Sequence, residues 1–418
     1  MKRIRTFSGK AGRGVLMMFS SLFVCILIFA GILLAWSSGK IEPFLDANGD
    51  VLAGSVSEKK HVMINGVQQG MIIRSKDISN PVLLFLHGGP GMPEYFLEEK
   101  YPAGLEEHFT VCWWEQSGAG LSYHSELQAE TITAEQLVAD TLEVTNYLRE
   151  QFGQDKIYLM GHSWGTFLGI QAAAQSPELY HAYIGISQIS RQAESERLAY
   201  THMLAQYQAV GNTKMARKLE AYPIHSDDAA FASYVSSFLR DEAMHELGIG
   251  TTRAMRSTAL GIFLPVMQCR AYTLDEKINL WRGKAFLAHS TTLRERMYAT
   301  DLTDQVPELE IPVYFFSGLY DYTVSYTLAR EYFEQLQAPI KGFYTLSNPR
   351  IVRCSKNGTN FCVLCWRMYC TPPSALRIPN NGRRRFVQGR IYENNFRKWR
   401  SICFIKQVKK HKKSWQNP

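Results

Sequence analysis

The segment Gly161-His-Ser-Trp-Gly165 is the feature that most restricts what this chain can fold into. The residues before it, Lys156–Met160, have the pattern of a β-strand, and an alanine-rich stretch after it has the pattern of a helix to about Gln175. Two glycines around a serine let the backbone pass a sharp, strained corner between a strand and a helix. A chance Gly-x-Ser-x-Gly in a loop would lack both neighbours. The sequence therefore predicts that Ser163 is exposed on a strand–turn–helix junction.

Such a turn is suited to nucleophilic chemistry. A serine hydroxyl attacks an acyl carbon only when it is exposed, oriented and relieved of its proton. The turn supplies the exposure, and the N-terminus of the following helix favours developing negative charge. Ser163 is therefore the candidate nucleophile.

A second glycine-rich segment, His87-Gly-Gly-Pro-Gly91, follows the unbroken apolar run Pro81–Leu86, which predicts a buried strand. Acyl transfer needs backbone N–H groups that bind the developing oxyanion. We expect these to be the N–H of Trp164 and one N–H within Gly88–Gly89. His87 precedes the serine in the chain, and we expect it to hold its loop through a hydrogen bond rather than to act as a base.

Strands and helices alternate along the rest of the body. Thr133-Ala-Glu-Gln136 has the form of a capping box and opens an expected amphipathic helix to about Phe152. The other expected elements are a hairpin of His61–Val67 and Met71–Ser75, strands Thr110–Trp114, Tyr183–Ser187, Ile311–Phe316 and Ile340–Leu346, and a helix Ser325–Leu336. This alternation predicts an α/β architecture, a mostly parallel sheet with helices on both faces. A Gly-x-Ser-x-Gly turn in such a sheet is the mark of the α/β-hydrolase fold.

The region from about Ser190 to Tyr298 differs, because its apolar residues recur at helical spacing with almost no β-runs. We interpret it as a helical cap inserted into the sheet domain. The predicted organisation is a basic cytoplasmic segment (1–14), a transmembrane anchor (15–36), a linker (37–58), a first core part (59–189), the cap (190–300), a second core part (301–346) and a basic tail (347–418).

Three motifs together, His87–Gly91, Trp114–Ser122 and Gly161–Gly165, resemble those of the proline iminopeptidase (prolyl aminopeptidase) family of α/β-hydrolases. The resemblance extends roughly from Val82 to Leu346. It implies that the chain releases N-terminal residues from short peptides through an acyl-enzyme, without a cofactor.

The family resemblance also implies a carboxylate in the cap that binds the free amine of the substrate. Glu194 and Glu196 are conceivable candidates, but neither matches a motif, and a solvated helix face is the favoured interpretation of both. Where the family has Asp-Gln-Arg, this chain has Glu115-Gln116-Ser117. The resemblance therefore leaves the substrate open.

The acid and the base of a catalytic triad follow the serine in this fold. Asp321 comes after the expected strand Ile311–Phe316, where the fold carries the acid, whereas Asp301 and Asp304 precede that strand and are poorer candidates. Of the eleven histidines, only His411 follows Asp321. It lies between two pairs of lysines, where charge repulsion opposes an imidazolium, so we do not expect it to act as the base.

The composition changes where that histidine is expected. Residues 347–418 hold 17 Lys/Arg against one acid, whereas residues 1–346 hold 29 basic and 37 acidic residues. One set of codons for Ser347–Phe361 reads, from its third base, Gln-Ser-Ala-His-Ser-Pro-Leu-Phe-Glu-Glu-Trp-Asn-Lys-Phe. We therefore interpret the tail as an out-of-frame translation that has lost the catalytic histidine, and we expect the chain as written to be nearly inactive. A nucleic-acid-binding tail is the alternative interpretation of its charge.

The N-terminus has the pattern of a membrane anchor. Val15–Trp36 holds 22 residues without a charge, enough to cross the ~30 Å hydrocarbon core as a helix. Five basic residues and no acid precede it, which favours a cytoplasmic N-terminus and an extracytoplasmic body. A cleaved signal peptide is the alternative, with Ala35-Trp36-Ser37 as a passable cleavage site.

The remaining expectations concern ligands. Cys362-x-x-Cys365 has no second pair at zinc spacing, so we expect no metal and no other cofactor. The expected partners are a small peptide or ester substrate and, through residues 15–36, a membrane; we expect no nucleic acid, and the oligomeric state stays open. Two other functions stay open, namely a membrane-anchored esterase or amidase with the same serine and a non-catalytic remnant of a frameshifted gene.

Overall fold

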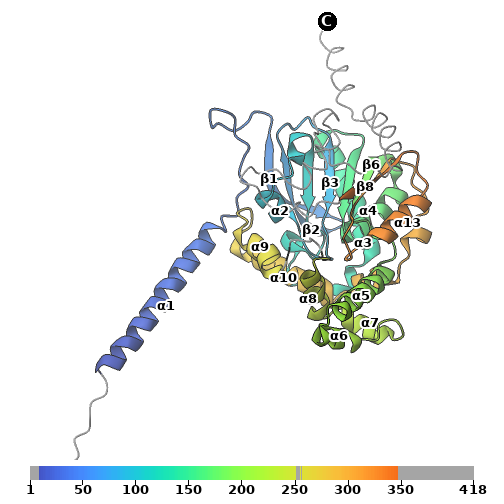
Figure 1. Cartoon of the computed structure of the whole chain (residues 1–418). Helices are drawn as coiled ribbons and strands as arrows, with labels where there is room; N and C mark the ends of the chain where they lie inside the picture. Colours follow the sequence, from blue (N-terminus) through green and yellow to red (C-terminus); the bar gives the residue numbers. More distant parts are fainter. Residues whose placement is uncertain (1–8, 251–254, 256, 347–418) are drawn as a thin grey trace, which may run out of the picture.

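The computed structural model describes residues 9–250, 255 and 257–346 (Figure 1). The basic tail, with His411 and the interpreted change of reading frame, lies outside these residues.

A sheet forms the centre of the body (Figure 1). It has eight strands in the order β1-β2-β4-β3-β5-β6-β7-β8. The strands are β1 (Val56–Ile64), β2 (Val67–Ser75), β3 (Val82–Leu86), β4 (Thr110–Trp114), β5 (Ile157–His162), β6 (Tyr180–Ile186), β7 (Val313–Gly318) and β8 (Lys341–Leu346). Strands β3 to β8 are parallel, whereas β2 pairs antiparallel with both β1 and β4. The predicted α/β-hydrolase fold with a mostly parallel sheet is confirmed.

Helices cover both faces of this sheet, and further helices lie outside it (Figure 1). The bounds are α1 (Gly9–Ala35), α2 (Tyr95–Lys100), α3 (Ala134–Phe152), α4 (Trp164–Gln175), α5 (Gln192–Ala209), α6 (Thr213–Glu220), α7 (Asp228–Val235), α8 (Phe238–Leu247), α9 (Leu264–Gln268), α10 (Leu274–His289), α11 (Leu293–Ala299), α12 (Leu302–Gln305) and α13 (Tyr326–Gln335). Single turns are η1 (Leu105–Glu107), η2 (Gly120–Ser122), η3 (Ala129–Thr131), η4 (Pro177–Leu179) and the π-type turn η5 (Ala259–Phe263).

Strand β3 shows how the sheet separates two apolar cores. Side chains of a strand alternate between its faces. Accordingly, Val82, Leu84 and Leu86 pack in the cluster that contains residues of α3 and α4. Leu83 and Phe85 pack on the other face, in the cluster that contains residues of α2 and α10. A strand buried on both faces reads as a continuous apolar run, which is why the sequence predicted it correctly.

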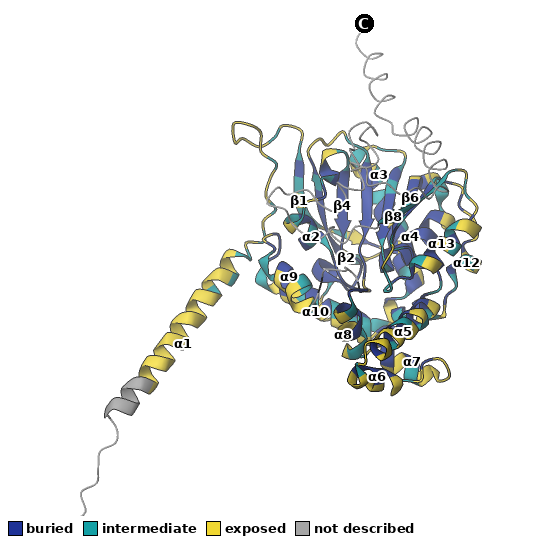
Figure 2. Ribbon diagram, in the orientation of Figure 1, coloured by how far each residue is buried: buried dark blue, intermediate teal, exposed yellow. Residues whose placement is uncertain are grey.

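The region interpreted as the cap consists of helices between β6 and β7. Helices α5 to α10 lie together on one side of the sheet domain in Figure 1, and much of their outer surface is exposed in Figure 2. The cap helices α5, α6, α7 and α8 have an apolar cluster of their own, which includes Tyr200, Met203 and Leu219.

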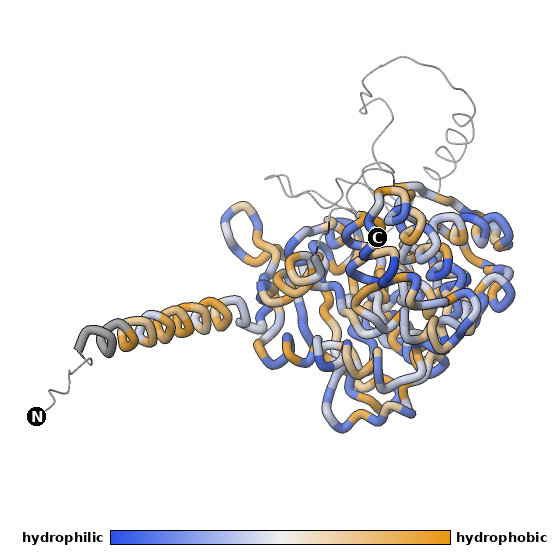
Figure 3. The backbone as a smooth tube through the Cα atoms, turned by 60° about the horizontal axis from the view of Figure 1, so that its bottom comes forward, coloured by the Kyte–Doolittle hydropathy of each residue, from blue (hydrophilic) through white to orange (hydrophobic). Residues whose placement is uncertain are grey.

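Helix α1 extends away from the body, and its residues are predominantly hydrophobic (Figure 3). Val15–Ala35 is long and apolar enough to cross a membrane, and none of its hydrophobic window is buried against the rest of the protein. A signal sequence near an N-terminus has the same properties.

The first hairpin differs from its prediction. The run His61–Val67 spans the end of β1, the turn and the first residue of β2, and Ile64 pairs with Val67 across the turn. Asn65 and Gly66 form the two-residue turn with φ of 47° and 80°. Asn-Gly is the strongest local hairpin signal, because both positions need a positive φ. Strand β1 also begins at Val56, within the range predicted as linker.

Only one of the two hydrogen bonds of the capping box predicted at Thr133 is present. The Thr133 hydroxyl accepts a hydrogen bond from the Gln136 N–H at 3.1 Å. The Gln136 side chain does not reach back to the cap but donates to Asp140 Oδ1 at 2.8 Å. Asp140 also accepts bonds from Asn65 Nδ2 at 2.7 Å and from Gln69 Nε2 at 2.8 Å. This buried carboxylate therefore joins α3 to the hairpin.

We expect Asp140→Ala to lower the free energy of unfolding by about 1–3 kcal/mol, because it leaves the buried Gln69 amide without its acceptor. Urea unfolding of the full chain in detergent measures the change. Glu143→Ala, at an exposed position of the same helix, is the control and should change the free energy by no more than about 0.5 kcal/mol. Equal effects of the two substitutions would contradict the role of Asp140.

Candidate active site

Ser163 occupies the corner between β5 and α4. Its φ is 49° and its ψ is −117°, a conformation that few non-glycine residues adopt. The flanking glycines explain how the corner closes. A Cβ on Gly161 would lie 2.5 Å from the Gly165 carbonyl oxygen, and a Cβ on Gly165 would lie 2.1 Å from the Leu86 carbonyl oxygen. The predicted strand–turn–helix junction is therefore present, and only glycine fits on either side of it.

Three loops meet at the carboxyl edge of the sheet. Ser163 follows β5, Ser187 follows β6 and Asp321 follows β7, and these three parallel strands are neighbours. The carboxyl ends of neighbouring parallel strands lie together, so the sheet gathers these residues at one edge.

Asp321 is held firmly at this edge. Its carboxylate accepts hydrogen bonds from Ser187 Oγ at 2.7 Å, from the Thr323 N–H at 2.9 Å and from the Val324 N–H at 3.1 Å. Burial raises the pKa of Asp321, and these hydrogen bonds oppose that shift. Ser187 also has a positive φ, 50°. The sequence analysis missed Ser187, whose only local signal is its place at a strand end.

The sheet topology indicates where the base of the predicted triad would lie. Strand β8 is parallel to β7, so its carboxyl end also lies at the edge that carries Ser163 and Asp321. The residues after Leu346 lie outside the described part of the chain. Within the described residues, the Ser163 hydroxyl has no hydrogen bond to an imidazole, and no described histidine follows Asp321.

His87 holds its loop, as predicted. Its Nδ1 donates to the Gly88 carbonyl at 2.8 Å, and its Nε2 accepts from the Gln116 N–H at 3.1 Å. Burial lowers the pKa of His87 to about 4, so the ring is neutral near pH 7 and can accept that bond. The imidazole is buried and both of its nitrogens are hydrogen-bonded, which fits a structural role.

Gln116 connects the glycine-rich loop to the elbow. Its Nε2 donates to the His87 carbonyl at 3.1 Å, and its Oε1 accepts from Trp164 Nε1 at 2.9 Å. Trp164 is fully buried, so its indole fixes the first turn of α4. One amide side chain therefore sets the spacing between the two predicted parts of the oxyanion hole.

The structure distinguishes the two candidate donors of the loop. The Gly88 N–H donates to Glu94 Oε1 at 3.0 Å and is committed there. Among the residues that the structure describes, the N–H groups of Gly89 and Trp164 have no hydrogen-bond acceptor. These two N–H groups are the better candidates for binding an oxyanion.

Glu94 is a site residue that the sequence analysis missed. Besides the Gly88 N–H, its Oε1 accepts from His162 Nδ1 at 2.8 Å. Burial lowers the pKa of His162, but the charge and hydrogen bond of Glu94, together with the charge of Asp321, make the net shift upward. One carboxylate oxygen thus joins the glycine-rich loop to the residue that precedes the nucleophile.

Glu115 makes a separate connection to the cap. Its carboxyl accepts from Tyr272 Oη at 2.5 Å and from the Leu121 N–H at 2.6 Å. Burial raises the pKa of Glu115 to about 7, against the opposing effect of these two bonds. Glu115, one of the two residues that depart from the family pattern, is therefore a buried contact between the sheet and the segment before α10.

The two cap glutamates have different environments. Glu194 is exposed and pairs with Arg191, so it is the solvated residue that the sequence predicted. Glu196 is not on a solvated face, because it is 1% exposed. Arg240 binds it with Nη2 at 2.6 Å from Oε1 and with Nε at 2.7 Å from Oε2. The partner cation offsets the cost of burying Glu196 and leaves it no free charge for a substrate amine.

Within residues 9–250, 255 and 257–346, no cluster of three or more His, Cys, Asp or Glu residues could hold a metal ion. Cys112 and Cys269 are buried free thiols.

Comparison with known proteins identifies a matching family model and similar proteins. Residues 81–347 match a family model described as the alpha/beta hydrolase fold. The probable aminopeptidase YbaC of Bacillus subtilis (strain 168) is 29% identical over 306 residues, which cover 70% of this chain and 90% of that protein. The proline iminopeptidase of Lactobacillus delbrueckii subsp. lactis is 38% identical over 88 residues, 21% of this chain and 29% of the relative.

A solved structure agrees with the fold. The proline iminopeptidase of Mycobacterium smegmatis superposes with a TM-score of 0.50 at 17% identity, over 74% of this chain and 94% of that chain. At this identity the likeness concerns the arrangement of the sheet and helices.

We expect Glu94→Gln to lower the pKa of His162, because burial then acts without the opposing carboxylate. NMR titration of the imidazole, assigned by its loss in His162→Asn, measures the shift. In the native chain the raised pKa adds stability below the unfolded value near 6.5, and this contribution is lost as pH rises through the folded pKa. An unchanged His162 titration in Glu94→Gln would show that another group sets its pKa.

Proposed function

This chain belongs to the alpha/beta hydrolase family, and we propose that it carries the machinery of a serine hydrolase of the proline-iminopeptidase type. Such an enzyme would release the N-terminal residue of a short peptide through an acyl-enzyme. The observation that carries the proposal is the strained Ser163 on the elbow between β5 and α4, beside the unpartnered N–H groups of Gly89 and Trp164 among the described residues.

In the proposed acylation, Ser163 Oγ forms a bond to the substrate acyl carbon. The carbonyl electron pair moves to its oxygen, where the N–H groups of Gly89 and Trp164 stabilise the negative charge. As the tetrahedral intermediate collapses, the bond to the leaving amine breaks. Water then releases the acid from the acyl-enzyme by the reverse sequence.

Two proton transfers in this reaction need a base. The Ser163 proton must leave during attack, and the departing amine must receive a proton. Asp321, held by three donors, is suited to orient an imidazole that follows β8. We propose that the chain as written is nearly inactive because no histidine stands in that place.

The end of the family match supports the proposed loss of frame. The family match ends at residue 347, where the basic composition begins. The alternative frame supplies a histidine four residues after Leu346, at the carboxyl end of β8. The topology calls for the base at that end.

We further propose that α1 is a retained single-pass anchor, with the N-terminus cytoplasmic and the catalytic domain extracytoplasmic. The 21-residue apolar span and the basic residues before it support this arrangement.

We expect the chain as written to show almost no turnover of a proline arylamide. A repaired chain, in which the alternative frame replaces residues from Ser347 onward, should turn it over. In the repaired chain, Ser163→Ala should reduce kcat about 10⁶-fold, and Asp321→Asn should reduce it about 10⁴-fold. Steady-state release of the arylamine measures these rates.

The matched control is Ser325→Ala in the repaired chain, which removes the cap of α13 and should leave kcat within a few-fold of the parent. Robust turnover by the chain as written, abolished by Ser163→Ala, would contradict the proposed loss of the base. Turnover of short-chain nitrophenyl esters but not of aminoacyl arylamides by the repaired chain would replace the aminopeptidase with an esterase.

A further inference from the structure

A short segment of the cap exposes an apolar face. Between Arg256 and Arg270 the sequence has no charged residue. Within this stretch, Leu260, Phe263 and Leu264 are 71%, 48% and 37% exposed. In the helical turns of η5 and α9 their spacing of three and four residues places them on one side.

The opposite side of the same segment is fixed to the body. Pro265 and Val266 are buried, and Val266 belongs to the apolar core on the α2 face of the sheet. Phe263 also packs against Trp281 of α10, with ring centroids 5.5 Å apart. The exposed face is therefore part of a packed element, and its three apolar side chains are grouped on one side of that element.

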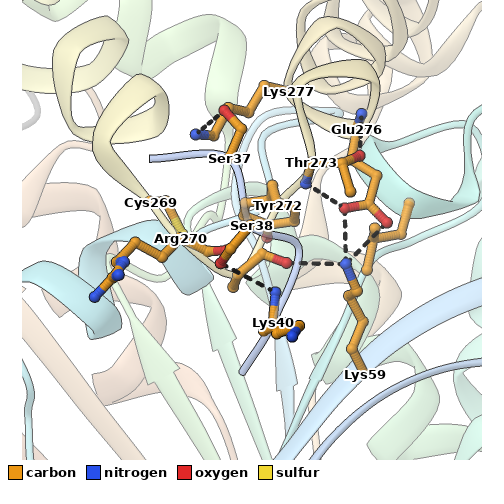
Figure 4. Close-up of polar contacts among 12 residues, drawn as sticks. Ser37, Ser38, Lys40, Lys59, Cys269, Arg270, Tyr272, Thr273, Glu276 and Lys277 are labelled. Carbon is orange, nitrogen blue, oxygen red and sulfur yellow. Dashed lines mark hydrogen bonds and ion pairs between the residues drawn. The ribbon is translucent and has the colours of Figure 1, made fainter. Parts of the chain in front are cut away.

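One lysine connects this element to the end of the membrane helix. Lys277 of α10 is fully buried. Its Nζ donates to the Trp36 carbonyl at 2.7 Å, to Ser37 Oγ at 3.0 Å and to the Met267 carbonyl at 2.8 Å. Figure 4 shows Lys277 directed at Ser37. Because Met267 lies in α9 and Trp36 directly follows α1, the two helices are held at a common point.

Further contacts hold the chain after α1 against the cap (Figure 4). Ser38 pairs with Thr273 in an antiparallel bridge, and its Oγ donates to the Arg270 carbonyl at 3.0 Å. Lys59 of β1 donates to the Ala271 carbonyl at 2.9 Å and pairs with Glu276 at 2.7 Å. The segment that follows α1 is therefore hydrogen-bonded directly to the cap.

We propose that the exposed face of Ala259–Gln268 contacts the same lipid bilayer that α1 crosses, as a second, interfacial contact. The inference rests on the proposed membrane anchor and extends it to the cap. The shared attachment at Lys277 places the apolar face beside the point where the chain leaves the bilayer. Apolar side chains on one helical face suit the boundary between acyl chains and phosphate headgroups.

This contact would set the orientation of the body relative to the membrane. The cap lies at the carboxyl edge of the sheet, where Tyr272 binds Glu115 and Leu287 lies close to Gly91. With both α1 and α9 at the bilayer, the cap side faces the lipid surface, and substrate dissolved in or adsorbed to that surface is nearest to the site.

Site-specific photocrosslinking in the full chain tests the contact. The chain is reconstituted in vesicles of phosphatidylcholine and phosphatidylglycerol that contain a clickable photostable lipid tracer. The probe p-benzoylphenylalanine replaces Leu260 or Phe263 in the test variants, Phe23 of α1 in the anchor control, and Ile78 in the background control. Ile78 is 49% exposed and precedes β3, at the edge of the sheet opposite the site.

We expect lipid adducts from the probe at positions 260, 263 and 23 to exceed those from the probe at position 78 severalfold. Adducts at 23 with only background at 260 and 263 would overturn the interfacial contact and leave the anchor intact. Background at 23 would overturn the anchor, and this inference with it. Crosslinks from 260 or 263 to a second copy of the chain, without lipid adducts, would show that the face is a protein interface.

Discussion

The absence of side chains at Gly161 and Gly165 is the constraint on which the rest of the site depends. Helix α4 begins so close to β3 that the backbone of Gly165 touches the Leu86 carbonyl. This close approach turns the chain at Ser163 and directs α4 back over the sheet. It also brings the loop after β3 next to the first N–H groups of α4, so the two proposed oxyanion donors arise from the same contact.

Side-chain hydrogen bonds then fix what the backbone has brought together. Gln116 spans the His87 carbonyl and the Trp164 indole, while Glu94 spans the Gly88 N–H and His162. The two bridges come from different loops and join the same pair of segments. A polar network that is satisfied at each end specifies one geometry, which a loop of glycines alone would not do.

The sequence predicted the parts of this structure that depend on local patterns. The apolar run of β3 and the glycines of the elbow each follow from neighbouring residues. Glu94 and the burial of Glu196 were not predictable in this way, since each depends on a partner distant in the sequence, His162 and Arg240 respectively. The turn at Asn65-Gly66 did carry a local signal, but the apolar residues on both sides of it obscured the end of β1.

The two edges of the sheet differ in how they are protected against pairing with another strand. Strand β1 carries Glu58, Lys59 and Lys60, and charges on an edge strand discourage addition of a further strand. Strand β8 reads Lys-Gly-Phe-Tyr-Thr-Leu, and among the described residues it pairs with β7 alone. Its charge stands only at the first residue. Of the two edges that the described residues form, β8 is therefore the less protected against addition of a further strand.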